Sequence, residues 1–336
     1  MKKTIMDCTL RDGANIVGAG FPADLTKMIL EGLTENNIPV IEMGNTKGLG
    51  AYEISNSIAP LNDEEYLELA QPFFSKSKVG MFLNAKRFAA KNVETAAKSG
   101  LGFLRIGADA GDHEIARDAI LCAKESGFEV FYALMKTYLC TPEELAEEVV
   151  WLSANGVSTV TLMDSAGTMF PEESFRYVAT AKRAAPNIQV GFHSHNNLYY
   201  AVANGISAVE AGANLIDGGL LGMARSAGNI ATEAGIACLE KKGYSTGVNL
   251  LGLLNFLDSR LIPSMEKYGY RTMLHPLDLI LGYAGCHSSF VPLFREVAKE
   301  TGADLYELII KVSKINRKAP SKMLMLEIAE QITAQV

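Results

Sequence analysis

Eight short apolar segments, rich in residues that favour β-strands, recur along the first two thirds of the chain. The spacing between successive segments leaves room for one helix and two loops each time. This alternation is typical of a parallel sheet, because parallel strands need a crossover connection between them. The predicted strands cover residues 4–8, 40–44, 78–83, 103–106, 130–134, 159–163, 190–193 and 214–217.

Eight such units can close on themselves, and the pattern therefore predicts an α/β fold of the (β/α)8 TIM barrel type over residues 1–245. A doubly wound sheet would more often carry a glycine fingerprint after its first strand, and no G-x-G-x-x-G sequence follows Cys8. From residue 246 to residue 336 the apolar spacing becomes helical, which predicts a small helical C-terminal domain. The helical spacing is clearest over residues 250–265, 293–300, 305–312 and 323–332.

Local signals mark the ends of the helices between the strands. Thr141 and Pro142, followed by two glutamates, predict an N-cap, a proline in the first turn and a favourable charge near the helix dipole. Gly100, Gly127 and Gly212 each lie between a helical pattern and the next strand, where a glycine commonly ends a helix.

Composition excludes several classes of protein. Apolar residues make up 48% of the 336 residues and charged residues 21%, as in folded globular proteins. A net charge of −7 argues against a nucleic-acid partner, and five scattered cysteines without a CxxC pair argue against a disulfide framework or structural zinc. Asp7 interrupts the first apolar run and no apolar stretch approaches about 20 residues, so we expect a cytoplasmic protein without a signal peptide or membrane span.

Two acids and an arginine follow the first predicted strand. In a TIM barrel the strand ends face the active site, so Asp7, Arg11 and Asp12 are expected at the barrel mouth. A buried cluster of this kind needs a cation or an anionic ligand to compensate it, although a structural Arg–Asp salt bridge is the alternative.

His193 and His195 follow the seventh predicted strand. Side chains at positions i and i+2 of a strand point the same way, so two imidazoles can face one metal ion together with Asp12. The alternative is a histidine that only hydrogen-bonds a loop. Two imidazoles and one carboxylate without a thiolate suit Mn²⁺, Mg²⁺ or Co²⁺ better than a structural zinc site. Asn229, in the glycine-rich segment 218–233, could add a carbonyl oxygen.

These motifs together identify a resemblance. Residues 7–13, the His193-x-His195 pair and residues 228–233 resemble the metal-dependent lyase and synthase barrels that include hydroxymethylglutaryl-CoA lyase, isopropylmalate synthase and 4-hydroxy-2-oxovalerate aldolase. Within that superfamily the chain is most similar to the oxovalerate aldolases, over nearly its whole length. The motifs that carry this closer similarity are residues 163–167, 281–285 and 288–290.

The resemblance implies a lyase that cleaves a 4-hydroxy-2-oxo acid to pyruvate and an aldehyde through a metal-stabilised enolate. Asp12, His193 and His195 would hold the divalent metal, with Asn229 as a further ligand. Mn²⁺ is the expected ion, with Mg²⁺, Co²⁺ and Zn²⁺ as alternatives.

The resemblance also assigns roles to residues beside the metal. Arg11 would stabilise the enolate, and Ser165 would bind the carboxylate of the small 2-oxo acid substrate. These roles suit the chemistry, because cleavage places negative charge on a former carbonyl oxygen.

Two positions depart from the aldolase pattern. Asn15 stands where the family has a histidine after Arg-Asp-Gly-Ser, and an asparagine side chain cannot take a proton. We therefore assign Asn15 to substrate binding. His287 stands where the family has a tyrosine before Ser-Ser-Phe, and we predict that it is the catalytic base.

Several alternatives remain open at this point. A Claisen-type synthase, an acyl-CoA lyase or a non-catalytic metal-binding docking partner would share the same barrel. Lys136 as a Schiff-base lysine would define a metal-free aldolase. Arg105 could bind a substrate carboxylate or pair with Glu42 or Asp164. The resemblance further implies an acylating aldehyde dehydrogenase as a partner, and we expect a homo-oligomer or hetero-oligomer.

Overall fold

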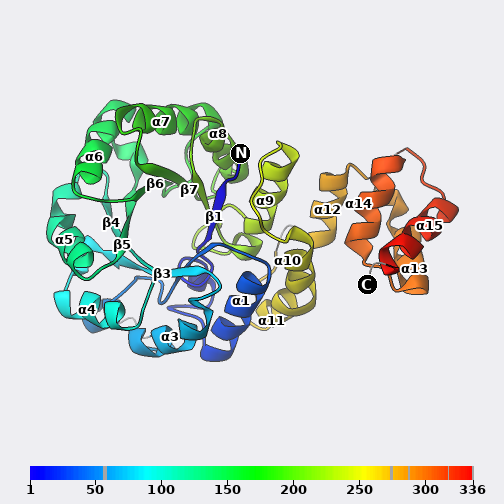
Figure 1. The fold of residues 1–336 in the computed structure, drawn as a ribbon, viewed down its shortest axis with the longest axis horizontal. Coiled ribbons are helices and arrows are strands. Elements are labelled where there is room, and N and C mark those ends of the chain that lie inside the picture. The colour runs from blue at the N-terminus through cyan, green and yellow to red at the C-terminus, as the bar shows by residue number, and fades with distance from the viewer. Residues whose placement is uncertain (56–58, 273–274, 287, 317, 335–336) are drawn as a thin grey trace.

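A computed structural model describes residues 1–55, 59–272, 275–286, 288–316 and 318–334. Eight parallel strands form a closed barrel in sequence order, and helices surround it (Figure 1). The predicted TIM barrel is confirmed, and each observed strand overlaps one predicted segment. The strands are β1 Thr4–Asp7, β2 Val40–Met43, β3 Lys78–Asn84, β4 Phe103–Asp109, β5 Glu129–Met135, β6 Thr159–Asp164, β7 Gln189–Ser194 and β8 Leu215–Gly218.

The interior of the barrel has an apolar layer and, above it, an ionic layer. Phe103 of β4 and Phe131 of β5 stack in the apolar layer with ring centroids 4.5 Å apart. Arg105 lies two residues after Phe103 on the same strand, and its side chain therefore points to the same interior, nearer the carboxyl ends of the strands. The pairing of β1 with β8, from Thr4 with Leu215 to Asp7 with Gly218, closes the sheet.

Helices pack on the outside of the barrel and bury the other face of each strand. The helices of this layer are α1 Ala23–Glu35, α2 Ala51–Ser55, α3 Asp63–Ala70, α4 Ala90–Lys98, α5 Arg117–Glu125, α6 Pro142–Ala154, α7 Pro171–Ala184, α8 Ala201–Glu210 and α9 Thr232–Lys241. Thr141 caps α6 by accepting from the backbone N–H of Glu144, as predicted. Gly100, Gly127 and Gly212 have φ angles of 83°, 85° and 112°, which confirms their predicted place at helix ends.

The secondary-structure elements after residue 249 are all helices in the described ranges, as predicted. Helix α10 (Leu250–Phe256) continues through a π-helical turn over Leu257–Leu261 into α11 (Ile262–Glu266). Beyond these lie α12 Pro276–Ala284, α13 Val291–Thr301, α14 Leu305–Ile315 and α15 Lys322–Thr333, which pack on one another beside the barrel (Figure 1).

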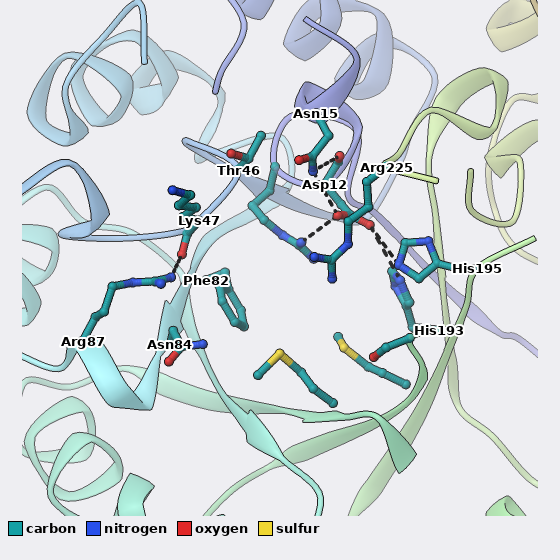
Figure 2. A pocket seen from close by; sticks show the side chains of 14 residues that line it. Asp12, Asn15, Thr46, Lys47, Phe82, Asn84, Arg87, His193, His195 and Arg225 are labelled. Atoms are coloured by element: carbon teal, nitrogen blue, oxygen red, sulfur yellow. Dashed lines mark hydrogen bonds and ion pairs between the residues drawn. The ribbon is translucent and has the colours of Figure 1, made fainter. Parts of the chain in front are cut away.

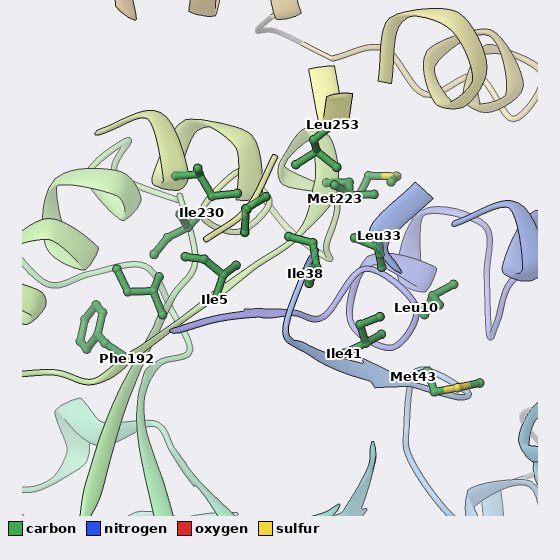
Figure 3. Packing of buried hydrophobic residues seen from close by; sticks show 14 of the residues in the cluster. Ile5, Leu10, Leu33, Ile38, Ile41, Met43, Phe192, Met223, Ile230 and Leu253 are labelled. Atoms are coloured by element: carbon green, nitrogen blue, oxygen red, sulfur yellow. The ribbon is translucent and has the colours of Figure 1, made fainter. Parts of the chain in front are cut away.

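The large hydrophobic core lies between the strands and the outer helices. Figure 3 shows Ile5 of β1 and Ile41 of β2 in this core. Leu253 of α10 is fully buried in the same cluster, so α10 packs as part of the barrel wall. None of the helices in the described ranges is both long enough and apolar enough to cross a membrane.

Candidate active site at the barrel mouth

A cavity of about 290 Å³ opens at the carboxyl ends of the strands (Figure 2). Three loops bring most of the predicted site residues into it. Arg11, Asp12 and Asn15 follow β1, Ser165 follows β6, and His193 and His195 lie at the end of β7. The closed parallel barrel explains this convergence, because the carboxyl ends of all eight strands lie at the same end of the barrel.

Asp12, His193 and His195 form a compact buried group. The Oδ2 atom of Asp12 lies 3.8 Å from the Nε2 atom of each histidine. One ligand atom from each of the three side chains lies within 4.8 Å of the others. The residues are only 2% to 3% exposed, so an ion held there would be shielded from water. The arrangement could hold a divalent cation and leave positions for substrate oxygens.

The charges of this group favour metal binding. Burial alone would raise the pKa of Asp12, but Arg11 and the two histidines hold that pKa well below its usual range, so the carboxylate is ionised. Burial, with His193 beside it, lowers the pKa of His195 to about 4. His195 is therefore a neutral imidazole near pH 7, which is the form that binds a metal. The backbone oxygen of Gly228 lies 3.3 Å from Nδ1 of His195, which favours the proton on Nδ1 and leaves Nε2 free.

Asn229 joins this group from the loop after β8. Its Nδ2 atom donates to Oδ2 of Asp12 over 2.9 Å, and its backbone forms a β-bridge with His195. Its Oδ1 atom is buried and has no hydrogen-bond partner within the described ranges. An orphaned oxygen beside one carboxylate and two imidazoles fits a bound cation. Asp12 follows β1, the two histidines lie at the end of β7, and Asn229 follows β8. These four residues therefore lie together where β1 pairs with β8 and closes the barrel.

An ionic network beneath the cavity fixes His193. The Nδ1 atom of His193 lies 3.1 Å from Oδ2 of Asp217. Arg105 donates to the same Asp217 oxygen over 2.5 Å and to Oε1 of Glu42 over 3.3 Å. The pairing of Arg105 with Glu42 agrees with one of the alternatives predicted from the sequence. Because Arg105 is fully buried, it does not reach a substrate carboxylate. Asp164 instead accepts from the backbone N–H groups of the loop after β6.

Arg11 lies beside the candidate metal ligands. Its Nε atom donates to Oε2 of Glu42 over 2.7 Å, and its Nη1 atom lies 3.1 Å from Oδ1 of Asp12. The guanidinium also covers the ring of Phe82 at 5.2 Å. Burial alone would lower the pKa of Arg11, but Glu42 and Asp12 more than offset that effect and raise it. Arg11 is thus a fixed positive charge at the cavity wall.

Asn15 and Ser165 both line the cavity, on different sides. The Nδ2 atom of Asn15 donates to the backbone oxygen of Asp12 over 2.8 Å. The Oγ atom of Ser165 accepts from the backbone N–H of Lys136 over 2.9 Å, which leaves its hydroxyl proton available as a donor.

Lys136 does not have the environment of a Schiff-base lysine. Its Nζ atom lies 2.9 Å from Asp109, and that hydrogen bond raises the pKa of the ammonium group. Schiff-base formation needs a neutral amine, so the structure disfavours this alternative. His287, the predicted base, lies outside the described residues.

Comparisons with known proteins agree with this geometry. The sequence profile of the HMGL-like family matches residues 2–259. The chain belongs to the HMGL-like family. It is 32% identical to the 4-hydroxy-2-oxovalerate aldolase of Carboxydothermus hydrogenoformans, over 99% of this chain and 98% of that one. It is 33% identical to the aldolase of the same name from Pelotomaculum thermopropionicum, over 92% and 90% of the two chains.

A solved structure shares the fold of this HMGL-like chain. The HMG-CoA lyase of Bacillus subtilis matches it with a TM-score of 0.68 at 18% identity, over 83% of this chain and 97% of that one.

Four charged residues of this HMGL-like site were not predicted from the sequence, and a fifth, Glu42, was predicted only as a partner of Arg105. Asp217 and Glu42 support His193 and Arg11 from inside the barrel. Lys47, Arg87 and Arg225 line the cavity from loops after β2, β3 and β8. A signal for the first two was present, because a single acid inside an otherwise apolar strand needs a buried partner.

Proposed function

We propose that this chain is a divalent-metal-dependent aldolase that cleaves a 4-hydroxy-2-oxo acid to pyruvate and an aldehyde, and also catalyses the reverse condensation. The observation that carries the proposal is the meeting of Asp12, His193 and His195 with Arg11 in one cavity at the barrel mouth. The relatives named 4-hydroxy-2-oxovalerate aldolase support the same reaction, because they match almost the whole chain.

Asp12, His193 and His195 would hold the metal, with Asn229 as a further ligand through its Oδ1 atom, which has no partner among the described residues. When bound there, a divalent ion supplies a Lewis acid that polarises the 2-oxo group. The donor set contains nitrogen and oxygen but no thiolate, which supports Mn²⁺ as the preferred ion and Mg²⁺, Co²⁺ or Zn²⁺ as alternatives.

Arg11 and Ser165 bind the pyruvate half of the substrate. Cleavage of the bond between carbons 3 and 4 places negative charge on the oxygen at carbon 2, and the guanidinium of Arg11 stabilises that charge. Glu42 and Asp12 hold the guanidinium in place, so little reorganisation is needed during the reaction. The Ser165 hydroxyl donates to the carboxylate at carbon 1.

The reaction also needs a group that takes the proton of the 4-hydroxyl. Asn15 cannot accept it, and its amide is already bonded to Asp12. We therefore assign Asn15 to substrate binding and His287 to proton transfer. The assignment of His287 rests on the sequence motif alone.

The helices α12 to α15 are proposed as the docking surface for an acylating aldehyde dehydrogenase, in a homo-oligomer or hetero-oligomer. Ile315 and Met323 in this part of the chain are 62% and 79% exposed, which supports a contact there. We retain a domain division between residues 245 and 246 as part of the proposal. Limited proteolysis tests that division. A first cut in the segment before α10 would support it, whereas a first cut after α11 would move the boundary there, because Leu253 of α10 packs in the barrel core.

The function is tested with protein that has been stripped by a chelator and reloaded with Mn²⁺. We expect pyruvate release from 4-hydroxy-2-oxopentanoate only after reloading, and no cleavage of hydroxymethylglutaryl-CoA. Cleavage of the CoA ester instead would assign the chain to the acyl-CoA lyases. Metal binding without any lyase activity would favour the non-catalytic docking role.

A further inference from the structure

Lysine and arginine side chains other than Arg11 also line this cavity. We call this set the cationic rim and define it as Lys47, Arg87 and Arg225. Figure 2 shows Lys47 and Arg87 across the cavity from His193 and His195, whereas Arg225 reaches over the metal side. These cations come from three different loops, so no local sequence motif brings them together. The fold places them around one opening.

The cationic rim has no carboxylate partner in the part of the chain that the structure describes. Arg11 and Arg105, by contrast, each pair with buried acids. The Nη2 atom of Arg87 donates to the backbone oxygen of Lys47, which orients the guanidinium. The Nε atom of Arg87 is buried without a hydrogen-bond partner in the described ranges. A half-buried guanidinium that lines a cavity and keeps an unused donor has the chemistry to bind an oxyanion.

The charged groups around the candidate metal site do not compensate the positive charges of the cationic rim. Glu42 and Asp12 together carry one more negative charge than Arg11, and a divalent ion would turn this into an excess of one positive charge. The carboxylate at carbon 1 of a 2-oxo acid compensates that excess. A substrate with an apolar tail would therefore leave three cations around the cavity unpaired.

We propose that the substrate carries a second oxyanion group, a carboxylate or a phosphate ester, on the part that leaves as the aldehyde, and that Arg87 binds it. This inference rests on the proposed aldolase function, because that function determines which end of the substrate lies at the metal. The metal side holds the 2-oxo acid end, so the opposite end of the substrate reaches Arg87 and Lys47.

Asn84 adds a further polar donor next to Arg87. It is the last residue of β3 and lines the cavity, and its Oδ1 atom accepts from the backbone N–H of Lys86 over 3.0 Å. That bond directs its oxygen into the protein and leaves its amide N–H₂ group for a ligand. The guanidinium of Arg87 and the amide of Asn84 thus give polar donors to a cavity that is also lined by the apolar side chains of Phe82 and Met135.

A binding experiment tests the inference without turnover. The probes are 2-oxoglutarate and 2-oxopentanoate, which have the same carbon chain but end in a carboxylate and a methyl group. Calorimetry on Mn²⁺-loaded protein should show at least about tenfold tighter binding of 2-oxoglutarate, since a charge-assisted hydrogen bond is worth that factor or more. The preference should shrink to less than about threefold in Arg87→Gln. Equal binding of the two probes by the unmodified protein would overturn the inference, as would an unchanged preference in Arg87→Gln.

Lys86→Gln is the matched control. Lys86 precedes Arg87, does not line the cavity and forms a 3.5 Å surface pair with Asp112. Its removal should leave the preference for 2-oxoglutarate intact. An equal loss in this variant would show a general effect of surface charge and would contradict a specific role for Arg87.

Condensation of pyruvate with three aldehydes then distinguishes whether the second oxyanion group is a carboxylate or a phosphate ester. Succinic semialdehyde carries a carboxylate, glyceraldehyde 3-phosphate carries a phosphate, and butanal is neutral. A kcat/KM at least about tenfold higher for one anionic aldehyde supports the inference and names the group. A preference for butanal contradicts it while leaving the aldolase function standing. If no aldehyde reacts, the proposed function fails, and the calorimetric preference still decides whether Arg87 recognises an oxyanion.

Discussion

The Nδ1 atom of His193 lies 3.1 Å from the Oδ2 atom of Asp217, inside the barrel and out of reach of solvent. Arg105 holds the pKa of Asp217 below its usual range even though burial acts in the opposite direction, so Asp217 is an ionised acceptor. A carboxylate in this position fixes the tautomer and orientation of a metal-binding imidazole, with Nε2 directed at the cavity.

Asp217→Asn should therefore weaken metal binding. The neutral amide accepts less strongly from His193 and leaves Arg105 with one carboxylate partner, Glu42. We expect Mn²⁺ affinity to fall about 10- to 100-fold, as measured by calorimetry on folded protein. Asp112→Asn, on the exposed loop before α5, is the control and should keep full affinity. A folded Asp217→Asn variant with unchanged affinity would show that the contact is only structural.

His195→Ala should remove bound metal and activity together and leave the barrel folded. The strands close through their backbone hydrogen bonds and an apolar core that does not include His195. Metal content and far-ultraviolet circular dichroism provide the two measurements. His275→Ala, at an exposed histidine, should match the unmodified protein in both. The metal assignment fails if the unmodified protein binds no divalent ion even in excess Mn²⁺.

Arg11→Lys should keep the metal but lower turnover by roughly 10²- to 10³-fold. Lysine retains the charge but cannot bond Glu42 and Asp12 through a planar fork and still face the substrate oxygen. Pyruvate release and Mn²⁺ content are measured on the same preparation. Near-normal turnover would reduce Arg11 to a structural partner of Glu42.

Glu233 should make the stability of the fold depend on pH. Burial raises its pKa to about 7, and its Oε1 atom has no hydrogen-bond partner in the described ranges. Between about pH 4.5 and pH 7 the unfolded chain loses this proton while the folded chain keeps it, so stability falls as pH rises.

Glu233→Gln should make the free energy of unfolding less dependent on pH. In the unmodified protein, ionisation of Glu233 should lower that free energy by about 3 kcal/mol. Urea unfolding at pH 5 and pH 8.5 measures the change in free energy. Glu327→Gln, on the exposed side of α15, should leave the pH dependence unchanged. An identical pH dependence in Glu233→Gln and the unmodified protein would exclude Glu233 as its source.

His287→Ala tests the predicted base. Removal of a general base costs typically 10²- to 10⁴-fold in rate, so turnover should fall at least to the lower end of that range with metal retained. The acidic limb of the pH–rate profile should disappear as well. Unchanged turnover with an unchanged acidic limb would turn attention to a metal-bound water, whose pKa is low enough for the same task.

The barrel and the meeting of Asp12, His193 and His195 could be predicted from the sequence, because both follow from periodic rules. Strand ends in a parallel barrel face one mouth, and residues two apart on a strand share a side, which is enough to bring His193 and His195 to Asp12. The π-helical turn between α10 and α11 was not predicted, because its apolar spacing is the same as that of a continuous helix.

The cationic rim could not be predicted, because the direction of a loop side chain depends on the backbone path of that loop. Arg87 owes its orientation to a bond with the backbone of Lys47, forty residues earlier in the chain. Asp217 and Glu42 were more accessible to sequence reasoning. Each lies two residues after an inward apolar position, so the strand period that predicted the core also placed these acids inside it.

The candidate metal ligands lie on the seam where the first barrel strand meets the last. Asp12 is made early in synthesis, whereas Asn229 and the loop after β8 emerge some two hundred residues later. A nascent chain therefore has no complete binding site until β1 has paired with β8. With Asp12 and Asn229 as the proposed ligands, uptake of the ion would require the completed ring, and a chain stalled on the ribosome before residue 229 would lack the full set of proposed ligands.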